Sequence, residues 1–176
     1  MFKKMKGFTL IELLIVIAII GILAALLIPN AMTAIQKAKQ KGTMKDIASI
    51  STALTDYVTD HGSGPSTSGS VTSTLVTTLS NFYLKVMPQK DQWANNFEVY
   101  SGLAATTAVR GCTFGGTDDF IVLSLGRDGS TDGVSYASAT PDAGFYTVNA
   151  MDDFKKDLIM WNGSWVRAPR AYAGTT

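Results

Sequence analysis

The chain has 176 residues, with 15 lysines and arginines against 14 aspartates and glutamates, so its formal net charge is +1. This length allows one domain of ordinary size plus an extra element, and the near-neutral charge gives no indication of a nucleic-acid partner. Cys112 is the only cysteine, which excludes a disulfide bond within the chain.

The first element is an apolar segment that follows a short basic leader. Lys3, Lys4 and Lys6 precede the run from Phe8 to Ile28, in which Glu12 is the only charged residue. The run is long enough for a helix that spans the hydrocarbon core of a bilayer. A cleaved secretory signal is the alternative, although the run is longer than a usual signal and continues as helix. The leader lysines favour a cytoplasmic N-terminus.

The junction KGFTLIEL, at residues 6–13, resembles the leader of type IV pilins and of the pseudopilins of type II secretion systems. The resemblance implies that a prepilin peptidase cuts after Gly7, which removes residues 1–7, and that the new N-terminal residue, Phe8, is N-methylated. It also implies that subunits leave the membrane and stack into a helical filament. There the carboxylate of Glu12 would pair with the terminal amine of Phe8 in a neighbouring subunit.

This pairing gives a physical reason for a glutamate near the start of an apolar helix. An unpaired carboxylate in lipid is costly, whereas a paired one is much less so. Assembly would therefore be favoured by the pairing of Glu12. The alternative is that Glu12 lies at the interface and extends toward the headgroups.

Gly21 and Pro29 also match the helix of this family. The resemblance implies that the helix melts between these two positions in the filament, while a simple kink at Pro29 is the alternative. From Asn30 the apolar residues keep helical spacing, and Gly62 can cap the helix after His61. We therefore expect a transmembrane and filament-core helix over residues 8–29, its amphipathic continuation over 30–61, and a globular head over 62–176.

The head shows short, mostly extended patterns. Residues 62–70, GSGPSTSGS, are predicted as a flexible loop, and a short helix is expected from Val71 to about Asn81. Asn162–Gly163 between two apolar runs predicts a two-residue hairpin turn. Strands are expected at residues 97–101, 120–125, 158–161 and 164–166. The expected fold class is α+β, a pilin fold with a long N-terminal helix, half of it transmembrane, packed on a small antiparallel sheet.

Three segments of the head resemble the major pseudopilin of type II secretion: MPQKDQWANNFEVYSG, DDFIVLSLGRDGSTDG and DLIMWNG. The matching residues are Pro88, Asp91, Trp93, Tyr100, Ser124, Gly126, Asp128, Gly129, Asp157 and Trp161. The chain also departs from the family. Residues 91–94 read DQWA where the family has Asp–Pro–Trp–Gly, the loop 133–151 is longer, and a tail follows the last hairpin.

The resemblance implies a structural Ca²⁺ in the loop between these segments. Calcium takes about six to eight oxygen ligands from carboxylates and carbonyls. Asp128 matches the family directly, and Asp157 matches if the longer loop leaves the alignment intact. The candidate ligands are Asp128, Asp132, Asp152, Asp153, Asp157 and the carbonyl of Leu125. A solvated acidic loop is the alternative, and no cluster of histidine and cysteine indicates zinc.

No sequence feature indicates an enzyme. The chain has one histidine and one cysteine, with neither a Gly-x-Ser-x-Gly element nor a phosphate loop. The predicted function is that of a structural subunit, which polymerises into the pseudopilus of a type II secretion system and helps export folded proteins across the outer membrane. Its expected partners are further copies of itself, the prepilin peptidase, minor pseudopilins and the inner-membrane assembly platform.

Two other functions stay open. A major type IV pilin would form an extracellular fibre for adhesion, motility or DNA uptake, but many such pilins close a C-terminal loop with a disulfide that Cys112 alone cannot form. A membrane-anchored binding protein would never polymerise. The expected location is the bacterial inner membrane, with a single span, the head in the periplasm and the filament periplasmic or extracellular.

Overall fold

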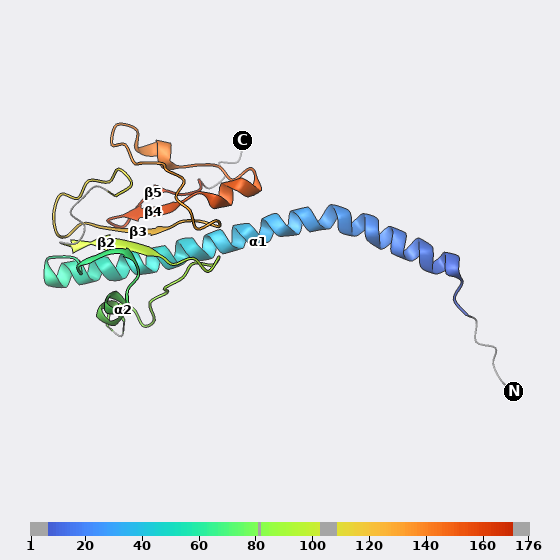
Figure 1. Ribbon diagram of the computed structural model, residues 1–176, viewed down its shortest axis with the longest axis horizontal. Helices are drawn as coiled ribbons and strands as arrows, with labels where there is room; N and C mark the ends of the chain where they lie inside the picture. Colours follow the sequence, from blue (N-terminus) through green and yellow to red (C-terminus); the bar gives the residue numbers. More distant parts are fainter. Residues whose placement is uncertain (1–6, 81, 103–108, 171–176) are drawn as a thin grey trace. The chain divides into compact units, whose positions relative to one another are not determined.

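The computed structural model describes residues 7–80, 82–102 and 109–170 (Figure 1). The chain divides into two compact units, Met1–Gln36 and Lys37–Thr176. The leader lysines at positions 3, 4 and 6 lie outside the described residues.

Helix α1 runs from Leu10 to His61, so it begins two residues after the predicted start and ends at the predicted residue. Gly21 and Pro29 both lie inside the helix, and the predicted melting between them in a filament stays a prediction. Among the described residues, α1 is the one helix long and apolar enough to cross a membrane, by length and composition. Its large apolar side chains from Leu10 to Ile35 are exposed, which distinguishes this segment from the core helix of a soluble protein.

The head contains one antiparallel sheet in which the strands follow chain order, β1-β2-β3-β4-β5. The strands are β1 (Thr67–Ser70), β2 (Glu98–Ser101), β3 (Phe120–Ser124), β4 (Leu158–Trp161) and β5 (Ser164–Arg167). A short helix, α2 (Ser73–Leu79), lies between β1 and β2, and its first turn is capped by the Thr72 hydroxyl. The 3-10 helices η2 (Pro141–Gly144) and η3 (Met151–Lys155) lie between β3 and β4. The predicted α+β fold class is confirmed.

The prediction of a flexible loop over residues 62–70 was wrong for its second half. Strand β1 pairs with β2, with Thr67 opposite Ser101 and Ser70 opposite Glu98. Sheet pairing uses backbone N–H and C=O groups, so small polar residues can add an edge strand without an apolar pattern of their own.

The centre of the sheet is buried on both faces, which explains the continuous apolar run of β3. One face packs on the head portion of α1, where Val99 and Val122 join Ile47, Ile50 and Leu54 of that helix in one core cluster. The opposite face forms a second cluster, made of Cys112, Ile121, Leu123, Ile159 and Val166. Burial raises the pKa of the Cys112 thiol to about 11, so the thiol stays protonated and serves as a small core residue.

The hairpin between β4 and β5 turns at the predicted dipeptide. Asn162 and Gly163 have φ values of 46° and 80°, the left-handed conformations that a two-residue turn of this kind requires. The Asn162 side-chain oxygen also accepts a hydrogen bond from the Phe120 N–H at 2.8 Å, which ties the turn to the start of β3.

Candidate assembly site and acidic loop of the head

Thr9 and Glu12 cap the first turn of α1 in a reciprocal arrangement. The Glu12 carboxylate accepts hydrogen bonds from the Thr9 N–H at 2.8 Å and from the Thr9 hydroxyl at 2.7 Å. The Thr9 hydroxyl accepts one from the Glu12 N–H at 3.3 Å. This is a capping box, which satisfies N–H groups that a helix start leaves without partners. The Thr-x-x-Glu spacing of residues 9–12 is the sequence signal of this motif.

The capping box holds the carboxylate of Glu12 at the very beginning of the helix. Gly7 and Phe8 precede the helix, and the Phe8 side chain is 81% exposed. The peptide bond after Gly7 therefore lies in exposed chain outside the helix. An amine created on Phe8 would be one residue away from the Thr9 N–H that Glu12 already binds, so the site places an acid where an N-terminal positive charge can meet it.

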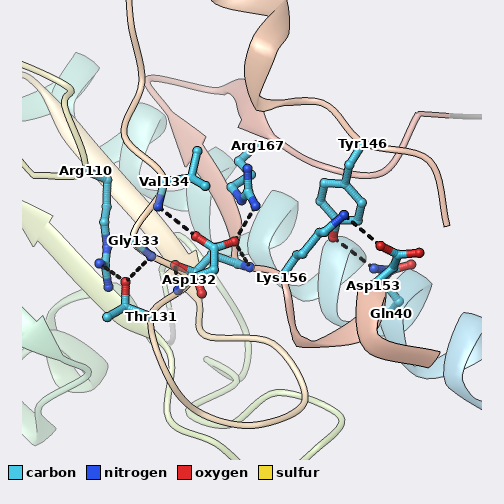
Figure 2. Close-up of polar contacts among 11 residues, drawn as sticks. Gln40, Arg110, Thr131, Asp132, Gly133, Val134, Tyr146, Asp153, Lys156 and Arg167 are labelled. Carbon is cyan, nitrogen blue, oxygen red and sulfur yellow. Dashed lines mark hydrogen bonds and ion pairs between the residues drawn. The ribbon is translucent and has the colours of Figure 1, made fainter. Parts of the chain in front are cut away.

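The second site is an acidic loop in the head, centred on Asp132 and Asp157. The Asp157 N–H donates to Asp132 Oδ2 at 3.1 Å, and the Asp132 N–H donates to Asp157 Oδ2 at 3.4 Å. Arg167 of β5 forms an ion pair with Asp132, whose other oxygen accepts from the Val134 N–H at 3.1 Å (Figure 2). The structure thus brings together two of the five predicted acidic ligands, and Arg167 at the end of β5 pairs with one of them.

The other three predicted acidic ligands have partners of their own. Asp128 Oδ1 accepts from the Ser130 N–H at 3.1 Å inside its own turn. Asp152 and Asp153 pair with Lys155 and Lys156, each at 2.7 Å. The Lys156 ion pair and the N–H groups of Ala150 and Asn149 lower the pKa of Asp153 to about 2.

Asp157 is fully buried, and burial raises the pKa of its carboxyl to about 7, with a further contribution from the neighbouring Asp132. Its Oδ1 atom is buried without a hydrogen-bond partner, which is the one observation here that would suit a bound cation. Within residues 7–80, 82–102 and 109–170, however, no three His, Cys, Asp or Glu side chains surround a point where a metal ion would fit. Calcium at this loop stays a prediction, and the side chains as arranged do not fit it.

Comparison with known proteins identifies the family of the chain. Residues 2–28 match the family model of the prokaryotic N-terminal methylation motif. Residues 30–140 match the family model described as type II secretion system (T2SS), protein G. That second match covers more than half of the chain. The chain belongs to the type II secretion system protein G family.

Curated relatives agree with this assignment. The chain is 31% identical to the type II secretion system core protein G of Vibrio cholerae, over 74% of this chain and 86% of the relative. It is 36% identical to that of Escherichia coli K12 over 53% and 70%, and 31% identical to that of Pseudomonas aeruginosa over 74% and 89%. No solved structure matches the chain. Family members are structural pseudopilins of the secretion system, not enzymes, and assemble into a pseudopilus with its other components.

Two of the head segments that resemble the major pseudopilin are joined by hydrogen bonds to Asp91, which gives this residue a structural role. Its Oδ1 accepts from the N–H groups of Trp93 and Asn95, each at 2.9 Å. Its Oδ2 accepts from the Ser124 hydroxyl at 2.7 Å, and the Asn95 side chain donates to the Gly126 carbonyl at 2.7 Å. Asp91 therefore fixes the turn before β2 against the end of β3.

Proposed function

We propose that this chain polymerises, after processing, into the pseudopilus filament of a type II secretion system and so helps export folded proteins across the outer membrane. The observation that supports this most directly is the exposure of the apolar half of α1, with Glu12 capping its first turn. Apolar surface of this extent is unfavourable in water. It needs lipid before assembly and the helices of neighbouring subunits after it.

The first step of the proposed route is processing at the N-terminus. A prepilin peptidase would cut the bond between Gly7 and Phe8, and the new amine of Phe8 would be methylated. The match to the N-terminal methylation motif over residues 2–28 supports this step. So does the position of both residues before the helix, where the chain can enter an active site without unwinding α1.

Assembly is the second step. An acid near the start of an apolar helix is costly in lipid when it has no partner. The hydrogen bonds from Thr9 satisfy part of the Glu12 carboxylate within one chain, but they bring no opposite charge. The amine of Phe8 in a neighbouring subunit would bring it, and a charge pair with good hydrogen-bond geometry offsets the desolvation of both groups.

This route gives the chain a place in the cell. Before assembly it would span the bacterial inner membrane once, with its leader in the cytoplasm and its head in the periplasm. The peptidase would act at the cytoplasmic face, and an inner-membrane platform together with minor pseudopilins would start and extend the filament.

The experiment uses a host strain that lacks this chain and carries the rest of the secretion system. Wild-type chain should restore export of the secreted protein, and its intact mass should show the loss of residues 1–7 and one added methyl group. Gly7→Val adds a branched side chain at the bond to be cut, so it should keep its leader and leave the exported protein in the periplasm. Ser68→Ala, at an exposed position of β1, is the control for expression and folding.

Two results would contradict the proposal. One is a wild-type chain that keeps its full mass and still supports export. The other is a processed wild-type chain whose presence makes no difference to the amount of exported protein in the medium.

A further inference from the structure

We propose that Arg167, positioned by Tyr146, is a built-in cation of the acidic loop and takes the place that the family resemblance gives to calcium. The head would then fold without a bound metal. The inference concerns the stability of the head alone and is independent of the proposed function in export.

Arg167 is placed as an interior cation. It lies at the end of β5, it is 6% exposed, and its guanidinium pairs with the carboxylate of Asp132. The guanidinium carbon also lies 5.4 Å from the centre of the Tyr146 ring, within the range of a cation–π contact. Figure 2 shows Arg167 pointing at Asp132, with Tyr146 to the right of Arg167. The ion pair and the cation–π contact therefore hold the buried guanidinium in this position.

The carboxylate of Asp132 is already supplied with donors. Its Oδ2 faces the Arg167 guanidinium and the Asp157 N–H, and its Oδ1 accepts from the Val134 N–H. A calcium ion would have to displace these groups, and the guanidinium would then lose its carboxylate partner inside the protein. Breaking a buried pair in this way is strongly unfavourable.

The positive charge of Arg167 also acts on a second carboxylate, that of Asp157. Asp157 Oδ1 and Arg167 Nε are both buried atoms without a hydrogen-bond partner, one an acceptor and the other a donor. Arg110 approaches the loop from the β2–β3 connection and donates to the Thr131 hydroxyl (Figure 2). The positive charges of Arg110 and Arg167 both act on Asp157, and Arg167 pairs with Asp132. These charges reduce the attraction of the two carboxylates for a divalent cation.

The longer loop between β3 and β4 accounts for the position of Arg167. Tyr146, which this loop supplies, exchanges backbone hydrogen bonds with the segment after β5, from its N–H to Ala168 and from Arg170 to its carbonyl, at 3.2 and 2.7 Å. The Tyr146 hydroxyl accepts a hydrogen bond at 3.1 Å from Gln40, a buried side chain of α1. Tyr146 is thus held at its backbone and at its hydroxyl, and its ring lies against the Arg167 guanidinium.

A close contact of the backbone confirms that this loop is built against β5. A Cβ atom on Gly144 would lie 2.0 Å from the carbonyl oxygen of Val166, so any other residue would push the loop away. The longer loop 133–151 therefore packs on β5. In this position it supplies Tyr146, whose ring contacts Arg167 at the end of that strand.

The test is thermal unfolding of the full chain in detergent micelles, followed by the circular dichroism of the head. The wild-type melting temperature should be the same in EDTA, in millimolar Ca²⁺ and in millimolar Mg²⁺ at matched ionic strength. A ligand that binds only the folded state raises the melting temperature, so a rise with Ca²⁺ that Mg²⁺ does not give would overturn the proposal. This comparison needs no variant.

The second arm removes the cation. Arg167→Met keeps most of the side-chain volume but leaves the half-buried Asp132 carboxylate without its ion-pair partner, so the melting temperature should fall by roughly 10 °C. Arg167→Lys keeps the charge, and should recover part of that loss. Lys85→Met is the control, since Lys85 is an exposed cation outside this loop, and it should melt like the wild type. An Arg167→Met chain that melts at the wild-type temperature would also overturn the proposal.

Discussion

Ala94 has a φ of 73°, a left-handed conformation that costs an L-residue roughly 1–2 kcal/mol. It stands directly after Trp93, at the position where the resemblance to the pseudopilin pattern leads us to expect glycine. Asp91 holds the turn in this conformation, because its backbone carbonyl accepts from the Ala94 N–H at 3.0 Å while its side chain caps Trp93 and Asn95. The strain at Ala94 is therefore imposed by its neighbours.

Ala94→Gly should stabilise the head by about 1 kcal/mol, since the relief of strain exceeds the greater flexibility of glycine in the unfolded chain. Ala94 is exposed, so little packing is lost. The measurement is urea unfolding of both chains in micelles, with Ala137→Gly as the control, because Ala137 is exposed and has no positive φ. A lower stability for Ala94→Gly than for the wild type would contradict this account of the turn.

At the scale of elements, the turn before β2 and the end of β3 depend on one buried hydroxyl. Ser124 is fully buried; its hydroxyl donates to Asp91 and accepts from the Gly126 N–H at 3.2 Å. Its side chain thus joins two segments that are far apart in the sequence.

Ser124→Ala should destabilise the head by about 2 kcal/mol, because it leaves a buried carboxylate oxygen and a buried N–H group without their partner. Thermal unfolding in micelles measures the loss, and Ser68→Ala on the exposed side of β1 is the control. If both variants melted at the same temperature, the Asp91–Ser124 contact would not be what holds these segments together.

The elements that could be predicted from the sequence are those with a local signal. Helix α1, strands β3 and β4 and the Asn162–Gly163 turn follow from spacing and from turn chemistry within a few residues. Strand β1 could not be predicted, because its small polar residues form a strand only through the backbone of β2.

The acidic loop illustrates the same limit at the candidate site. Its aspartates are visible in the sequence, but their partners are not, since Arg167 meets Asp132 only once β5 has folded beside the loop. Asp152 and Asp153 each pair with a lysine only three residues further along the chain. The number of charges in the segment does not indicate these pairs. The N-terminal motif could be predicted because its residues, Gly7, Phe8 and Glu12, lie within six positions of one another in the chain, and residues 2–28 match the methylation-motif model. Cleavage after Gly7 and methylation of Phe8 stay predictions.

For the whole molecule, the surface that we propose to assemble and the residues that stabilise the head belong to different compact units. The unit Met1–Gln36 exposes a nearly uninterrupted apolar helix, while the unit Lys37–Thr176 contains both core clusters and the acidic loop. The head can therefore be altered at Ala94, Ser124 or Arg167 without touching the surface that we propose to assemble. Variants of Glu12 should do the reverse, and leave the melting of the head unchanged.

The most direct measurement of the central claim is the fraction of processed chain recovered in sheared filaments, for wild type and for Glu12→Leu, in a host with the complete secretion system. We predict that both chains lose residues 1–7, and that wild type appears in filaments while Glu12→Leu stays in the membrane fraction. Glu98→Gln, a substitution in β2 of the head, should assemble like the wild type. Filaments of Glu12→Leu at the wild-type level would contradict the account, because assembly would then not depend on the charge that α1 carries at its start.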